Sequence, residues 1–457
     1  MNEKLVLIGA GSAMFTRGLV ADVLRQGWDG ELALVDVDQE ALEIAHKLTK
    51  KMIEAKASSL AVTATTDRRQ ALPGATSVIC TIGVGGRRAW EVDAYIPRKY
   101  GIYQPVADSV MPGGSSRALR MIPAMVDVAK DVVDLAPDAL FFNYGNPMSA
   151  ICRGVNKGTG ATMTGLCHGV NAIAGFIAHH LGATREQLTY KALGINHLIW
   201  FVKIAIDGED AMPRLREVAV EKLGKALNVD QMGQRFAEAG TAAPDAVPET
   251  DNPFAWELTE LFGAFPAVLD RHITEFFPHM FSRKGAYYGK TLGVDAYSVE
   301  QTIEHGDAIF ADMRTHAPSP DPLPEDYFDE MSGEHEQVTE IIHSIRTDAK
   351  KEFSANLSNG GQVPNLPRHA VIECPAIAGA DGLTPIQNDP MNSALVGTLA
   401  DRFQWVETIV DAALECSREK FVQALLIDGS VDSVDTAYRL ADELLAAQKQ
   451  HLPEAWQ

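Results

Sequence analysis

The sequence has few cysteines, a shortage of cations and no long hydrophobic run. Its five cysteines are an odd number at scattered positions, which does not suit the framework of a disulfide-stabilised domain. No stretch of eighteen or more apolar residues occurs, which argues against a membrane-spanning helix. The first residues have the pattern of a strand and lack a cationic leader and a cleavage site. We therefore expect a cytoplasmic protein with reduced thiols.

The shortage of cations also limits the partners of this protein. The chain has 40 Lys and Arg residues against 61 Asp and Glu residues, which gives a formal net charge of -21. Because such a field repels polyanions, we expect neither nucleic acid nor an anionic membrane surface as a partner. An anionic small molecule would need a local cluster of arginine or lysine side chains.

The length and the apolar pattern predict two domains and an α/β fold. At 457 residues the chain exceeds the usual size of one core, and we expect domains at residues 1–195 and 196–457. The first alternates apolar runs with helix-periodic segments, which is typical of a doubly wound, Rossmann-like parallel sheet. The runs that predict its strands are residues 4–11, 31–38, 60–67, 77–83, 139–147 and 161–168. The second is expected to be a mixed, mainly helical domain for substrate binding and for assembly into a homodimer or homotetramer.

A glycine-rich segment after the first strand indicates a nucleotide site. In GAGSAMF (9–15), Gly9 permits a tight turn and Gly11 lets the backbone approach a pyrophosphate. Met14 stands where a third glycine is usual. Asp36 ends the next strand, where a carboxylate can bind both ribose hydroxyls, so the pattern favours NAD over NADP. The predicted cofactor residues are Gly9, Gly11, Ser12, Ala13, Met14, Phe15, Asp36 and Asn146; a glycine turn without a ligand is the alternative.

Polar residues end the fifth and sixth predicted strands, at the edge where such sheets bind ligands. Asn146 follows the fifth strand, and Cys167 and His168 end the sixth. His197 lies in the next apolar stretch. A thiolate and an imidazole from separate elements can hold a divalent cation and leave positions open for substrate. The alternatives are an inert buried thiol, a core histidine and an Asn-Pro turn.

These motifs, in this order, resemble glycoside hydrolase family 4, whose NAD- and divalent-metal-dependent glycosidases depart from the two-carboxylate rule. The resemblance covers nearly the whole chain and includes LIGAGSAMFT (7–16), PGGSSRALRMIP (112–123), NYGNPMS (143–149), GLCHGV (165–170) and LGINHLIWF (193–201). It implies that Cys167 and His197 are ligands of a metal, usually Mn²⁺. It further implies that Asn146 contacts the sugar hydroxyls near the nicotinamide.

The resemblance also implies a route for glycoside cleavage. NAD⁺ takes a hydride from C3 of the sugar, a base removes the C2 proton, and an acid assists departure of the glycosidic oxygen from C1. Water then adds, and the hydride returns. The residue after the cysteine acts as the acid in phospho-α-glucosidases of the family, which implies His168 here. Asp270 resembles the carboxylate of non-phospho members and is the expected base, and Asp108 is a further catalytic candidate. A solvated turn acid is the alternative for Asp270.

Two departures from the phospho-sugar members of the family indicate a different substrate. Those members typically carry Asp or Asn after the thiolate and an Arg that grips the phosphate, whereas His168 and Trp90 occupy these places here. The Cys-His-Gly motif resembles the members that cleave α-linked uronic acids, galacturonides first and glucuronides second. A uronate carboxylate calls for a guanidinium. The arginine candidates are Arg87, Arg88, Arg117 and Arg271. We prefer Arg88 and Arg271, with His272 as a further substrate contact.

The residues by themselves leave other functions open. An α-glucosidase or α-galactosidase of the same family would use the same cofactors. A lactate/malate-type dehydrogenase shares the doubly wound fold and needs no metal. A non-catalytic NAD-binding module would need no cysteine–histidine pair.

Overall fold

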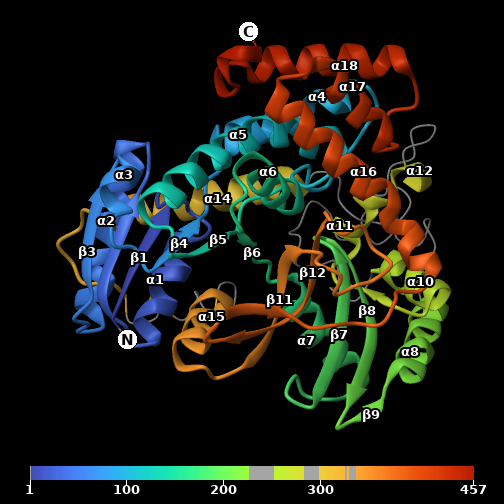
Figure 1. The fold of residues 1–457 in the computed structure, drawn as a ribbon, viewed down its shortest axis with the longest axis horizontal. Helices are drawn as coiled ribbons and strands as arrows, with labels where there is room; N and C mark the ends of the chain where they lie inside the picture. Colours follow the sequence, from blue (N-terminus) through green and yellow to red (C-terminus); the bar gives the residue numbers. More distant parts are fainter. Residues whose placement is uncertain (1, 226–251, 282–297, 325–326, 329–335, 457) are drawn as a thin grey trace, which may run out of the picture.

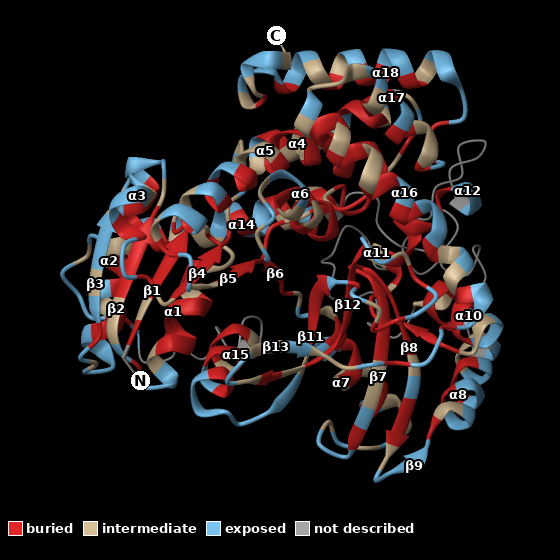
Figure 2. Cartoon of the chain, viewed as in Figure 1, coloured by how far each residue is buried: buried red, intermediate tan, exposed pale blue. Residues whose placement is uncertain are grey.

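The computed structural model describes residues 2–225, 252–281, 298–324, 327–328 and 336–456. Its central feature is one mixed sheet of 13 strands that runs through both halves of the chain. The main path is β10-β8-β7-β12-β11-β6-β5-β4-β1-β2-β3, with β13 beside β12 and β9 beside β8. The buried strands form the middle layer, and helices cover them on both sides (Figure 1, Figure 2).

The first 181 residues form the expected doubly wound part. Its strands β3, β2, β1, β4, β5 and β6 are all parallel to one another. The elements are β1 (Asn2–Ile8), α1 (Thr16–Arg25), β2 (Asp29–Val35), α2 (Gln39–Ala55), β3 (Ala61–Thr65), α3 (Arg68–Ala71), β4 (Ser77–Cys80), α4 (Gly86–Arg98), α5 (Met111–Leu135), β5 (Leu140–Asn143), α6 (Met148–Thr159), β6 (Thr164–Gly165) and α7 (Gly169–Leu181). The prediction of a Rossmann-like parallel sheet is confirmed.

The sixth strand is much shorter than the sequence predicts. Only Thr164 and Gly165 pair with β5, although residues 161–168 have the composition of a strand. A Cβ atom at Gly165 would lie 2.5 Å from the Met148 sulfur and 2.9 Å from Cβ of Asn356, so this crossing requires glycine. The chain then leaves the sheet, and Cys167 and His168 lie in the connection that leads into α7.

The C-terminal half continues the same sheet with antiparallel strands. These are β7 (Leu188–Ile195), β8 (Leu198–Ile206), β9 (Glu209–Asp210), β10 (Phe265–Pro266), β11 (Lys351–Ser358), β12 (Val371–Gly379) and β13 (Gly382–Pro385). Strand β11 joins β6 through the single pair Asn356↔Gly165, and β12 joins β7 through the single pair Glu373↔Gly194. The division at residue 195 stays a prediction; in the structure it falls between β7 and β8 of one hairpin.

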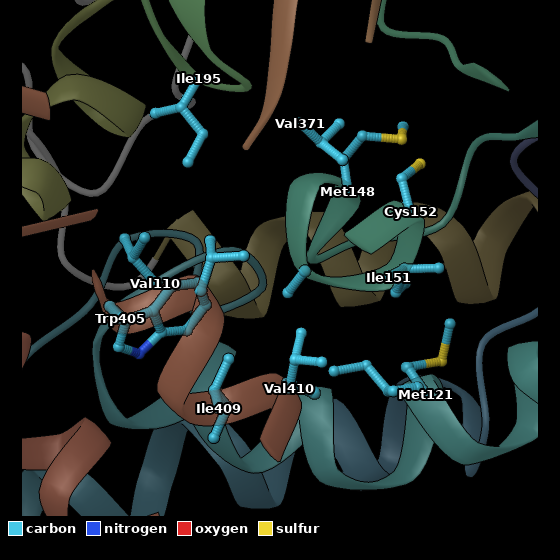
Figure 3. Packing of buried hydrophobic residues seen from close by; sticks show 14 of the residues in the cluster. Val110, Met121, Met148, Ile151, Cys152, Ile195, Val371, Trp405, Ile409 and Val410 are labelled. Carbon is cyan, nitrogen blue, oxygen red and sulfur yellow. The ribbon is translucent and has the colours of Figure 1, made fainter. Parts of the chain in front are cut away.

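The remaining helices cover this sheet and the doubly wound part. They are α8 (Met212–Lys225), α10 (Pro253–Phe262), α11 (Asp270–Ile273), α12 (Pro278–Phe281), α14 (Ser298–His316), α15 (Glu336–Thr347), α16 (Ser393–Glu415), α17 (Arg418–Ile427) and α18 (Val434–Gln448), with 3-10 turns η2 (Thr274–Phe276), η4 (Lys449–His451) and η5 (Glu454–Trp456). Helix α16 packs on α5 and α6, and α18 packs on α4. The core between them includes Met121, Ile151, Trp405 and Val410 (Figure 3). None of the helices that the structure describes is both long and apolar enough to cross a bilayer.

Candidate active site

The glycine loop after β1 packs too closely for any other residue at two positions. Gly9 has φ +96°, and a Cβ atom there would lie 2.8 Å from the backbone nitrogen of Ile82. A Cβ atom at Gly11 would lie 2.6 Å from Cβ of Ala41. The Gly11 amide donates to Oδ2 of Asp36 over 2.7 Å. The loop and the carboxylate at the end of β2 are therefore one unit, as a dinucleotide site requires.

The rest of the loop leads into α1 without the third glycine. Ser12 accepts a hydrogen bond from the backbone of Phe15 at 3.3 Å, and Thr16 donates to the carbonyl of Ala10 at 2.8 Å. The Phe15 ring lies 5.5 Å from the ring of Tyr144, which follows β5. Ala13 is buried, while Ser12 and Met14 are half-buried. The loop thus reaches the strand end that also leads to Asn146.

His197 is presented by the two-residue turn between β7 and β8. Its φ is +66°, a left-handed conformation that costs an ordinary residue about 1–2 kcal/mol. Its Nδ1 atom lies 2.9 Å from the Ser109 hydroxyl, which donates to Oδ1 of Asp108 at 2.7 Å. Because the serine proton is committed to the carboxylate, Nδ1 carries the imidazole proton and donates. The lone pair therefore lies on Nε2, as a metal ligand needs.

Two histidines and an ionised aspartate adjoin His197. The rings of His197 and His272 are 4.5 Å apart. Burial lowers the pKa of both histidines. Burial opposes ionisation of Asp108, but His197, His272 and Arg117 outweigh it and hold the pKa of that carboxyl below its usual value. His168 is exposed at the start of α7, and its charge acts on His197.

Cys167 belongs to the same cluster. Its sulfur accepts from the Gly169 amide at 3.5 Å. Burial, reinforced by the Glu373 carboxylate, raises the pKa of the thiol to about 12, while Asp108 acts in the same direction. A divalent cation would have to displace that proton. No group of three or more His, Cys, Asp and Glu side chains in the described ranges has the arrangement of a metal site. The thiolate and Nε2 of His197 fit a cation that takes its other ligands from substrate and water.

Asn146 and Arg117 also lie beside Asp108. Asn146 donates from its side-chain amide to Oδ2 of Asp108 at 2.9 Å. Arg117, on α5, donates from Nε to the main-chain oxygen of Asn146 at 3.0 Å. Its guanidinium carbon lies 5.7 Å from the ring centre of Trp90, whose indole donates to the carbonyl of Val106 at 2.7 Å. Within the described part of the chain, neither terminal NH₂ group of Arg117 makes a hydrogen bond or an ion pair.

Of the two preferred arginines, the structure brings only Arg271 to the site. Its terminal nitrogen donates to the hydroxyl of Thr302 on α14 at 2.6 Å, and the charge of Asp108 acts on it. Arg88 is exposed on the far side of α4 and pairs with Glu91 and Asp307. The substrate role of Arg88 stays a prediction, and in the structure its guanidinium pairs with Glu91 and Asp307 and not with Asp108.

In the structure, the carboxylate of Asp270, the predicted base, lies at the N-terminus of α10, and its catalytic role stays a prediction. This carboxylate is fully buried, and its two oxygens accept from the amides of Phe254 and Ala255 at 3.0 and 2.8 Å. It caps the N-terminus of α10, and burial raises its pKa to about 7. Asp270 is fully buried with both oxygens held by helix amides, whereas Asp108 is half-buried, so Asp108 is the better placed of the two to take a proton from a substrate.

Sequence reasoning missed four polar residues of the site. Ser109 orients His197, and Glu275 accepts from the amides of Val106 and Ala107 at 2.8 and 2.9 Å, which holds the loop in front of Asp108. Asn196 precedes His197 and donates to Glu373, whose charge acts on Cys167. One signal was available for the two glutamates, since each stands in an otherwise apolar run, in ITEFF (273–277) and VIECPA (371–376).

The comparisons with known proteins agree with this architecture. The chain is 29% identical to an alpha-glucosidase of Erwinia rhapontici, over 98% of each chain. It is 28% identical to an alpha-galacturonidase of Bacillus subtilis, over 93% of this chain and 92% of the relative. Its fold matches a 6-phospho-alpha-glucosidase from gut microorganisms, solved in complex with NAD and Mn²⁺, with a TM-score of 0.80 at 18% identity, over 99% of this chain and all of the other.

Two family descriptions together match most of the sequence. Residues 4–183 match "Family 4 glycosyl hydrolase", and residues 192–431 match "Family 4 glycosyl hydrolase C-terminal domain". The first match contains the glycine loop, Asp108, Asn146 and Cys167, and the second contains His197. The protein belongs to family 4 of the glycosyl hydrolases and is a glycosidase.

Proposed function

We propose that this glycosidase cleaves α-linked uronides, with α-galacturonides as its preferred substrates. The observation that carries the proposal is the Arg117 guanidinium, which lies beside Asn146 and Asp108 with both terminal NH₂ groups unpaired among the described residues. A guanidinium binds a carboxylate through two parallel hydrogen bonds. This cation also meets the need of an acidic chain for local positive charge at an anionic substrate.

Further support comes from the residues that flank Arg117. Trp90 packs against the guanidinium at the position where phospho-sugar members carry an arginine, so the cleft has one cation fewer for a phosphate. Arg271 adds a second guanidinium near Asp108. The alpha-galacturonidase of Bacillus subtilis is nearly as similar as the alpha-glucosidase of Erwinia rhapontici, so identity alone does not separate a uronide from a neutral glycoside.

The proposal includes NAD and a divalent cation. The Gly9–Phe15 loop and Asp36 fit the dinucleotide, and Cys167 with Nε2 of His197 fits the cation. When bound, NAD⁺ accepts a hydride from the sugar and the cation polarises the resulting carbonyl. A family 4 structure of the same fold contains both groups.

The residues of the chain supply orientation and proton transfer. Asn146 holds the sugar hydroxyls, and Arg117 fixes the carboxylate, so the ring is oriented at two points. Asp108 replaces Asp270 as the candidate base, because its lowered pKa keeps it ionised near neutral pH. His168 is exposed at the mouth of the cluster and donates a proton to the leaving oxygen.

A substrate panel tests this proposal. We would assay p-nitrophenyl α-galacturonide, α-glucuronide, α-galactoside and α-glucoside with a 6-phospho-α-glucoside, each with NAD⁺, Mn²⁺ and a reductant. The expected result is release from the two uronides, with the galacturonide cleaved faster. Release of p-nitrophenol from the neutral or phosphorylated glycosides alone would overturn the proposal. Faster cleavage of the glucuronide than of the galacturonide would show that the enzyme prefers the gluco configuration at C4.

A further inference from the structure

The sheet is joined by single residue pairs at two junctions, and each junction lies close in sequence to one of the two candidate metal ligands. Strands β6 and β11 share one residue pair, as do β12 and β7, whereas β7 and β8 pair along nearly their whole length. Cys167 lies two residues beyond Gly165 of the first pair, and His197 lies three residues beyond Gly194 of the second. The backbone ladder alone therefore constrains the separation of these two side chains poorly.

One buried carboxylate connects the two junctions. Glu373 on β12 is fully buried, and its Oε2 atom accepts from the side-chain amides of Asn196 and Asn356, each at 3.0 Å. Its Oε1 atom accepts from Ser354 at 3.3 Å. Asn356 also donates to the carbonyl of Gly165 at 3.3 Å. Glu373 is thus tied to the residue before His197 and, through Asn356, to the strand end that leads to Cys167.

We propose that Glu373 is a positioning residue that sets the separation between the Cys167 sulfur and the His197 imidazole and thereby the affinity for the divalent cation. The inference rests on the metal site of the proposed function. Burial of a carboxylate costs several kcal/mol, and an apolar side chain would fill the same space without that cost. The carboxylate gathers three donors from two segments, the turn that carries Asn196 and strand β11, which an apolar side chain cannot do. Partners of this kind behind a ligand typically change metal affinity by about 10- to 100-fold.

The chain offers matched variants for a test. Glu373→Ala removes the network. Glu373→Gln keeps one oxygen for the two asparagine amides and can turn its own amide toward the Ser354 oxygen, so it preserves the geometry without the charge. Ser354→Ala removes only the hydrogen bond on the other oxygen, which leads to neither ligand. Asn196→Ala breaks the link from Glu373 toward His197 and also removes the hydrogen bond between the Asn196 side chain and the Cys167 sulfur.

The measurements are Mn²⁺ affinity by titration calorimetry, the thiolate-to-metal absorption band with Co²⁺, and NAD⁺ affinity by fluorescence. For Glu373→Ala we expect Mn²⁺ binding weaker by about 10- to 100-fold, a weaker Co²⁺ band and unchanged NAD⁺ binding. Glu373→Gln and Ser354→Ala should bind Mn²⁺ like the wild type. A merely structural role would lower the melting temperature and leave Mn²⁺ affinity in place.

Each outcome separates this inference from the proposed function. If the wild-type protein binds no Mn²⁺, the metal site of the proposed function fails. If the wild type binds Mn²⁺ and folded Glu373→Ala binds it equally well, the positioning role is overturned. If Glu373→Ala does not fold, Asn196→Ala tests the positioning role instead. Wild-type Mn²⁺ affinity in Asn196→Ala would show that the bond between Glu373 and Asn196 does not position His197.

Discussion

The Nε atom of Arg117 donates to the main-chain oxygen of Asn146 over 3.0 Å. This bond ties a cation on α5 to the strand end that carries the predicted sugar contact. This hydrogen bond uses Nε, one of the three guanidinium nitrogens, and so fixes the position of the cation. The two terminal NH₂ groups remain available to a substrate anion. The selectivity of the enzyme can therefore be tested at one side chain.

Replacement of Arg117 by lysine should reduce selectivity for uronides. Lysine keeps the charge and one hydrogen bond but loses the second, parallel one, which is worth about 1.5–3 kcal/mol when charge-assisted, so kcat/KM for the α-galacturonide should fall about 10- to 100-fold. Steady-state kinetics on the α-galacturonide and α-galactoside measure the ratio. Arg88→Ala is the control, since that arginine forms only exposed ion pairs, and its kinetics should not change. Equal losses on both substrates would contradict carboxylate recognition.

Cys167→Ser should abolish metal-dependent turnover and leave NAD⁺ binding in place. A serine hydroxyl is a much poorer ligand than a thiolate, whereas the glycine loop lies on a different strand end. Mn²⁺ titration of the apo-variant and NAD⁺ fluorescence titration measure the two properties separately. A variant with the wild-type rate and Mn²⁺ affinity would show that the thiol is no ligand.

Gly11→Ala should weaken NAD⁺ binding without unfolding the protein. The added Cβ would lie 2.6 Å from Ala41 and 2.8 Å from Oδ2 of Asp36, so the loop must move away from the carboxylate that binds its amide. Titration with NAD⁺ and circular dichroism give affinity and fold. Gly397→Ala in α16 is the matched control, because the space around that glycine is open. Wild-type NAD⁺ affinity in Gly11→Ala would exclude this loop from the cofactor site.

Asp270→Asn should lower stability and leave the pH profile of kcat/KM unchanged. Asparagine offers one oxygen to the two amides at the N-terminus of α10, and its NH₂ group faces the other amide, which costs about 1–3 kcal/mol. Denaturant unfolding measures the first effect, and pH–rate profiles measure the second. Loss of the acidic limb of the profile would restore Asp270 as the catalytic base.

Glu275 should make the metal-free protein less stable at high pH. Burial raises the pKa of this carboxyl to about 8, above its unfolded value of about 4.3, so its folded form holds the proton more tightly. Its contribution is complete below the unfolded pKa and is lost as the pH rises through 8, on the order of 5 kcal/mol in total. Unfolding from pH 5 to 9 should show this decline, and Glu275→Gln should flatten it.

The exposed Glu54 provides the control for this measurement. Glu54→Gln should keep the pH dependence of the wild type, because its side chain lies in water on α2. If Glu275→Gln and the wild type lose stability in parallel between pH 5 and 9, Glu275 does not hold a proton in the folded state.

Local sequence carried much of the fold and part of the site. The doubly wound sheet follows from apolar strands and helical periodicity, which are set by near neighbours. The glycine loop with Asp36, and the strand ends at Asn146 and Cys167, follow from the rule that parallel strands share one carboxyl edge. The short β6 was not predictable, because its contact with β11, where Asn356 pairs with Gly165, joins residues 191 positions apart.

What the sequence alone determined is the family, the class of fold and which residue types can bind a dinucleotide and a metal, since short ordered motifs carry that information. Tertiary structure alone decided that Arg117 and not Arg88 faces Asp108, that Asp270 caps a helix, and that Glu373 stands behind the metal candidates. The physical reason is the range of the contacts. Arg88 is held by Asp307 across 219 residues, and Asn196 meets Glu373 across 177. No local pattern specifies which polar groups such distant segments bring together.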